Sequence, residues 1–81
     1  MTPNEEPATA HALYLRDLGH LIREMAVESK QAAAASQSDF ATGYMAGFHR
    51  VVSLMQQQAE AFEIPLTDIS LDGFDPDSEL V

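Results

Sequence analysis

The sequence predicts an all-α protein in which two helices form an antiparallel hairpin and an acidic C-terminal tail packs across it. Three observations support this fold class. Apolar residues recur at intervals of three and four over two long segments, a serine-rich turn signal separates the segments, and a proline ends the second one. We expect one domain, with a lead-in at 1–7, a helical hairpin at 8–64 and a tail at 65–81.

The first helix is expected from about residue 8 to residue 35, with Pro7 suited to its first turn. At about 100° per residue its apolar side chains share one stripe, which we expect to face the core. The polar side chains fall opposite, toward solvent. The stripe consists of His11, Tyr14, Leu18, Leu21, Ile22, Met25 and Ala32, and the polar side of Arg16, Asp17, His20, Arg23 and Glu24.

The turn is expected near residues 36–38. Ser36, followed three residues later by Asp39, has the form of a helix start signal, and Ser38 is the competing cap. A tight turn here folds the second helix back on the first. One continuous helical rod is the alternative.

The second helix is expected from about residue 39 to residue 63, ending at Ile64–Pro65 because a residue before proline avoids the helical region. Its apolar arc covers about half of the circumference, which is wider than one facing helix needs. The tail or a second protomer must therefore cover the remainder.

Helix pairs of this length commonly dimerise, so we expect a homodimer in the form of a four-helix bundle. Five polar residues of the second helix are expected to face away from the apolar arc: Thr42, His49, Ser53, Gln56 and Glu60. The residues expected to meet a partner or a second protomer are Tyr44, Met45, Gly47, Phe48, Val51, Val52, Met55 and Phe62.

Gly43 and Gly47 lie one helical turn apart in the middle of the second helix. Each costs about 1 kcal/mol relative to alanine, so a compensating role is expected. Three interpretations are open: close packing against the first helix, contact with a partner helix, or room for bulky neighbours such as Tyr14 or Met25.

The charge is one-sided, since residues 51–81 hold no Lys or Arg and supply −7 of the formal net charge of −9. Such a field repels nucleic acid and anionic lipid and attracts basic protein surfaces or cations. We therefore expect a basic protein partner, and neither direct nucleic-acid binding nor a membrane. The acidic residues are Glu60, Glu63, Asp68, Asp72, Asp75, Asp77 and Glu79.

Apolar residues alternate with these acids in the tail, so we expect it to dock through them and to hold its carboxylates outward. Leu66 to Leu71 is expected to form a short helical turn. The docking residues are Leu66, Ile69, Leu71, Phe74 and Leu80.

Few chemistries are available to this chain. It has no cysteine for a disulfide or a thiolate zinc site, no phosphate-binding glycine loop, and no nucleophile placed beside a base.

Asp17, His20 and Glu24 share one helix side, with His49 near the height of Glu24. Carboxylates and imidazoles in such a group can bind a metal, but we expect a solvated face there. No membrane-spanning run or signal segment is recognisable. We expect a non-enzymatic, cofactor-free cytoplasmic protein.

The tail also resembles the loop of an EF-hand over twelve residues, with carboxylate and hydroxyl oxygens at alternate positions and a glycine for the sharp turn. The resemblance implies weak calcium binding. It departs from the pattern at Asp75 and Pro76, and the alternative interpretation is two turns, at Asp72–Gly73 and Asp75–Pro76. The matching residues are Asp68, Ser70, Asp72, Gly73 and Glu79.

These observations favour a small acidic protein that acts by protein–protein binding, as a regulatory, adaptor or inhibitor module. Its size, acidity and helix content are similar to those of small regulatory or inhibitor proteins of bacteria and phages. One alternative is a nucleic-acid mimic that blocks the basic groove of a DNA- or RNA-binding protein. The other is a weakly calcium-responsive tail loop.

Overall fold

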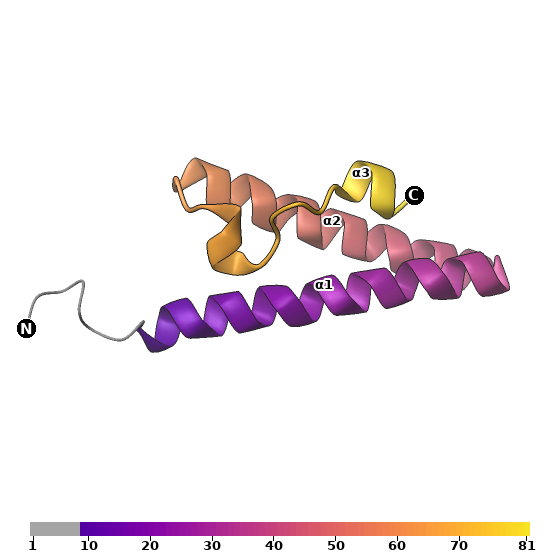
Figure 1. Ribbon diagram of the computed structural model, residues 1–81. Coiled ribbons are helices and arrows are strands. Elements are labelled where there is room, and N and C mark those ends of the chain that lie inside the picture. Colours follow the sequence, from indigo (N-terminus) through magenta and orange to yellow (C-terminus); the bar gives the residue numbers. More distant parts are fainter. Residues whose placement is uncertain (1–8) are drawn as a thin grey trace, which may run out of the picture.

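Two long antiparallel helices joined by a short turn form the body of the molecule (Figure 1). The computed structural model describes residues 9–81, with α1 at Ala10–Ser36 and α2 at Asp39–Ala61. The tail adds the 3₁₀ helix η2 at Leu66–Ile69 and the short helix α3 at Pro76–Glu79. The predicted all-α hairpin is confirmed, and the continuous rod is excluded. The predicted lead-in at 1–7 and the helix start at residue 8 lie outside the described residues.

Side-chain caps define the hairpin turn. Gln37 adopts a left-handed conformation with φ of 53°, which ends α1. The Ser38 hydroxyl then accepts a hydrogen bond from the Ala41 amide at 3.1 Å. Ser38 is therefore the N-cap of α2, whereas Ser36 is the last residue of α1 and its hydroxyl donates to the Ala32 carbonyl.

The second helix ends two residues earlier than predicted. Glu63 has a left-handed φ of 58°, and the Ile64 amide donates to the Ala59 carbonyl at 2.7 Å. This pattern is a Schellman motif, which closes α2 before Pro65 is reached. The motif turns the chain back toward α1.

The returning tail lies between the two helices at the end of the hairpin far from the turn (Figure 1). There η2 contacts both α1 and α2, and the chain then runs back along the hairpin to α3, which contacts α2. Leu71 and Leu80 are completely or almost completely buried, and Ile69 and Phe74 are buried with them. The predicted docking of the tail through its apolar residues is confirmed, and the predicted helical turn corresponds to η2.

The core side of α1 matches the predicted stripe only in part, at Ile22, which packs against the core, and at the half-buried Leu18. Small residues, Gly19, Ala26 and Ser29, are buried instead, whereas Tyr14, Leu21 and Met25 are exposed. The prediction was wrong because the tail, rather than a second large helix face, supplies the bulk of the core. Because the buried side chains on this side of α1 are small, the tail can approach the α1 backbone closely.

The closest approach is at Gly19. A Cβ atom on this residue would lie 1.7 Å from the Ile69 carbonyl oxygen and 2.8 Å from its carbonyl carbon. By contrast, apart from its chain neighbours and the backbone of its own helix, a Cβ added to Gly43 or Gly47 has no atom of residues 9–81 within 4 Å. The interpretation that these two glycines pack closely inside the hairpin, or make room for its own bulky residues, is therefore wrong.

We predict that Gly19→Ala lowers the free energy of unfolding by about 1–3 kcal/mol, because either η2 or α1 must move to admit the methyl group. Gly43→Ala is the matched control. It should raise the free energy of unfolding by about 1 kcal/mol, since the site is open and alanine favours the helix. Urea unfolding followed by circular dichroism measures both. Equal effects of the two substitutions would contradict the close contact.

Candidate functional site

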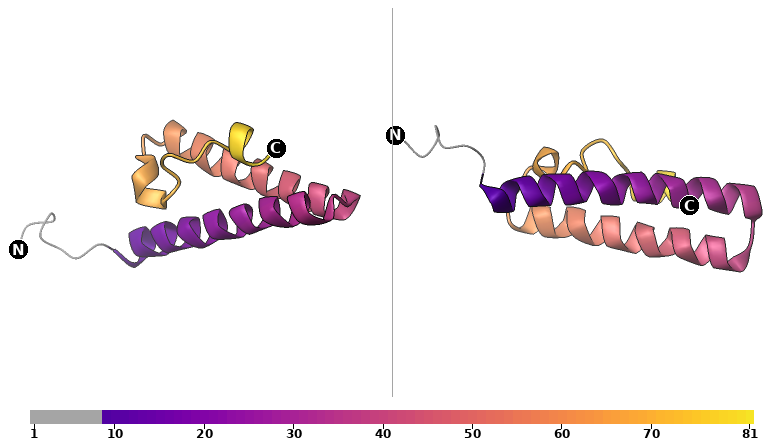
Figure 2. Two further views of the ribbon diagram at one scale, coloured as in Figure 1. Left: turned by 45° about the vertical axis from the view of Figure 1, so that its right-hand side comes forward. Right: turned by 90° about the horizontal axis from the view of Figure 1, so that it is seen from below.

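The hairpin has two sides of different character (Figure 2). The tail covers one side, where it contacts Gly19 and Arg23 of α1 and Gln56 of α2. Residues about 120–180° around each helix from these contacts lie on the other side. We call this uncovered surface the open face. It comprises Tyr14, Leu21, Met25, Phe40, Tyr44, Val51, Leu54 and Phe62.

The open face is apolar, yet it is well exposed. Phe40 is 82% exposed, Phe62 73% and Tyr14 65%. Phe40 stacks on Tyr44 with ring centroids 6.2 Å apart, and Tyr44 meets Phe48 edge-on at 5.2 Å, so an aromatic row follows α2. On small proteins in general, large exposed apolar patches are often interaction surfaces.

The structure divides the predicted interface residues into three groups. Tyr44, Val51 and Phe62 are exposed on the open face, and Gly47 lies among them with open space above it. Phe48 and Met55 are half-buried beside the core. Two residues need correction: Met45 is only 8% exposed and Val52 is completely buried, so both belong to the core of the chain itself and present no surface to a partner.

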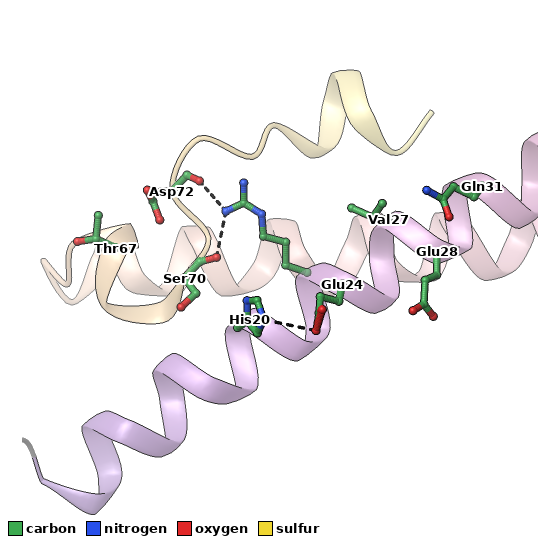
Figure 3. A pocket seen from close by; sticks show the side chains of 9 residues that line it. His20, Glu24, Val27, Glu28, Gln31, Thr67, Ser70 and Asp72 are labelled. Atoms are coloured by element: carbon green, nitrogen blue, oxygen red, sulfur yellow. Dashed lines mark hydrogen bonds and ion pairs between the residues drawn. The ribbon is translucent and has the colours of Figure 1, made fainter.

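On the covered side, Arg23 holds the tail (Figure 3). Its Nη1 donates to the Ser70 carbonyl at 3.1 Å and to the Asp72 carbonyl at 2.8 Å, and its guanidinium lies 5.2 Å from the centroid of the Phe74 ring. The prediction that Arg23 faces solvent was wrong. Helix periodicity places it opposite the large apolar residues, and only the folded tail reveals what lies there.

Other hairpin groups also bind the tail main chain. Gln56 Nε2 donates to the carbonyls of Leu71 at 3.1 Å and Phe74 at 2.7 Å, and Lys30 Nζ donates to the main-chain oxygen of Val81. These tail carbonyls lie outside regular helix ladders and need donors when they are covered. Helix periodicity correctly predicted that Gln56 points away from α1, but the tail, rather than solvent, lies on that side.

The acidic residues spread over the tail side. We call the seven carboxylates predicted as the acidic surface the acidic face, and all seven residues are exposed. The Asp77 carboxylate pairs with His49 Nε2 at 2.8 Å, the Asp75 carboxylate accepts from the Asp77 amide, and Glu79 accepts from the Asp75 amide. The remaining four, Glu60, Glu63, Asp68 and Asp72, make no ion pair within residues 9–81.

The predicted calcium loop is not assembled. The Ser70 hydroxyl donates to the Arg16 carbonyl at 3.0 Å, and the Glu79 carboxylate is turned to the Asp75 amide. In the part of the chain that is described, no group of three or more His, Asp or Glu side chains is placed to hold a metal ion. The oxygens that resemble an EF-hand therefore serve as tail contacts and caps.

Charged and imidazole residues of α1 line a shallow pocket beside the tail (Figure 3). In it His20 Nε2 lies 3.4 Å from the Glu24 carboxylate, an exposed pair within one helix. Arg23 is another lining residue of this pocket. Within residues 9–81, Asp17 and His49 make no hydrogen bond or ion pair with His20 or Glu24, so these four residues are not joined as a site.

We predict that Arg23→Met lowers the free energy of unfolding by about 1–3 kcal/mol, because the partly buried Ser70 carbonyl and the exposed Asp72 carbonyl lose a charged donor. Arg16→Met is the matched control, since the Arg16 side chain is exposed and makes no hydrogen bond to any of residues 9–81. It should change the free energy of unfolding by less than about 0.5 kcal/mol. Thermal melts measure both, and a control as destabilising as Arg23→Met would contradict the tail-holding role.

None of the helices in the described range has a run long and apolar enough to cross a membrane. No family model matches the chain, and no curated protein or solved structure is significantly similar to it. What the chain does must therefore be argued from its two faces.

Proposed function

We propose that this chain is a non-enzymatic protein-binding module, of regulatory, adaptor or inhibitor type, that works as a homodimer. The open face is the observation that carries the proposal. It gathers eight large apolar side chains on the side of the hairpin that the tail leaves uncovered. Such a surface is stabilised when a matching apolar surface covers it.

A second copy of the chain is the occupant that fits best. Side chains of about 150–200 Å², each roughly half exposed, offer on the order of 800 Å² per protomer, which is what a standard stable interface buries on each partner. The open face extends along nearly the whole of α2, from Phe40 to Phe62, and along α1 from Tyr14 to Met25. Two such faces in contact make a four-helix bundle.

Dimerisation through the open face leaves the acidic face outward on both copies, because the tail lies on the opposite side of each hairpin. The dimer then presents two separate clusters of carboxylates. Clusters of one charge sign attract oppositely charged surfaces and speed their association. We propose a basic protein surface as the partner of the acidic face.

A nucleic-acid mimic remains a second candidate, favoured by the exposure of all seven carboxylates of the acidic face. The two candidates differ in what they displace. A mimic competes with duplex DNA for the groove of a basic DNA-binding protein, and loses that competition steeply as salt rises. Fluorescence anisotropy of a labelled duplex bound to such a protein separates the candidates: displacement at low salt supports the mimic, and no displacement contradicts it.

For dimerisation, light scattering at micromolar concentration should give twice the chain mass of 8.9 kDa. Val51→Lys should give a folded monomer, because it places a charge in the middle of the apolar interface. Thr42→Lys, an exposed position of the same helix outside the open face, is the matched control and should remain dimeric. A monomeric wild-type chain would contradict the proposal.

A further inference from the structure

We infer the arrangement of the dimer: the two hairpin turns lie at the same end, α1 of each copy packs on α2 of the other, and Arg50 pairs with Glu24 and Glu28 of the second copy. This inference rests on the proposed homodimer. It adds the orientation of the two copies and the residues that select it.

The register of the hairpin places these charges at one height. The Ser36 and Ser38 hydroxyls lie 3.3 Å apart across the turn. At 1.5 Å of rise per residue in both helices, residues whose numbers sum to about 74 therefore lie level with each other. Arg50 of α2 is level with Glu24 of α1, and Glu28 is one turn away.

The position of these residues around each helix places them at the margins of the open face. Glu24 and Glu28 lie beside Leu21 and Met25, on the edge of α1 that is farther from α2. Arg50 lies beside Leu54, on the edge of α2 that is farther from α1. When the turns share one end, the outer edge of α1 meets the outer edge of α2 of the other copy, so opposite charges face each other.

The other two-fold arrangement, with turns at opposite ends, places α1 on α1 and α2 on α2. On the outer margin of α1 lie three acids, Asp17, Glu24 and Glu28, with His20 beside Glu24, so like charges would then meet. Charge complementarity therefore selects the arrangement with both turns together, in the way that flanking charges set the orientation of coiled coils.

Two further observations fit this arrangement. Arg50 is exposed and makes no ion pair in residues 9–81, since its neighbour Asp77 is bound to His49. Gly47 forms an empty notch, with nothing within 4 Å of an added Cβ. In the inferred dimer Met25 of the other copy lies at about the height of this notch. Open space at Gly43 and Gly47 is compatible with contact by a partner helix, and also with no special role for the two glycines.

Cysteine cross-linking tests the arrangement directly, because the chain has no native cysteine. Met25→Cys and Gly47→Cys are prepared separately, mixed under mild oxidation and analysed by mass spectrometry. The inferred arrangement gives the mixed disulfide between the two variants. Disulfides of each variant with itself, without the mixed species, would indicate turns at opposite ends and overturn the inference.

A charge swap provides the second test and leaves the apolar face intact. Arg50→Glu alone, and Glu24→Lys with Glu28→Lys in one chain, should each weaken the homodimer about tenfold, since each creates two repulsive contacts. Mixing the two variants should restore wild-type affinity as a heterodimer, because both contacts are then attractive. Arg16→Glu is the control and should leave the affinity unchanged.

The outcomes separate the two proposals. A monomeric wild-type chain contradicts the homodimer itself. A wild-type dimer in which the mixed charge-swap pair binds no better than either variant alone contradicts only the arrangement. Restored affinity in the mixed pair, at low salt and less so at high salt, supports the arrangement.

Discussion

The contact between the Ile69 main chain and Gly19 is the constraint on which the rest of this structure depends. Without a side chain at residue 19, η2 lies directly against the α1 backbone and holds the two helices apart at the end far from the turn. The space opened in this way is filled by Ile69, Leu71 and Phe74. The tail is therefore part of the core of the molecule, and the hairpin alone would lack most of its large buried side chains.

An irregular segment can lie in a core only if its main chain is satisfied. Here Arg23, Gln56 and Lys30 donate to tail carbonyls, and within residues 9–81 no buried side-chain nitrogen or oxygen lacks a partner. Because these donors bind main-chain oxygens, they fix the path of the tail and do not depend on which side chains it carries. The tail is thus free to carry carboxylates wherever its side chains point outward.

The position of the tail gives the molecule two different surfaces. Because the tail covers one side of the hairpin and fills the core from that side, the largest apolar residues of both helices are left on the other side. An acidic surface and an apolar surface on opposite sides suit a module that assembles through one and binds through the other. The glycines of α2 belong with the apolar surface, where they shape a notch rather than a core.

The sequence by itself determined the local structure. Periodicity, the Ser38 cap and Pro65 placed both helices and the turn within a few residues, since these signals act over one or two turns of chain. The alternation of apolar and acidic residues in the tail also predicted how it would dock.

What only the tertiary structure decided is which side of each helix faces inward. Periodicity finds an apolar stripe but not what covers it, so Tyr14, Leu21 and Met25 were placed in the core and Arg23 in solvent. Gly19 was missed because its role depends on Ile69, fifty residues away, and no local pattern records such a contact.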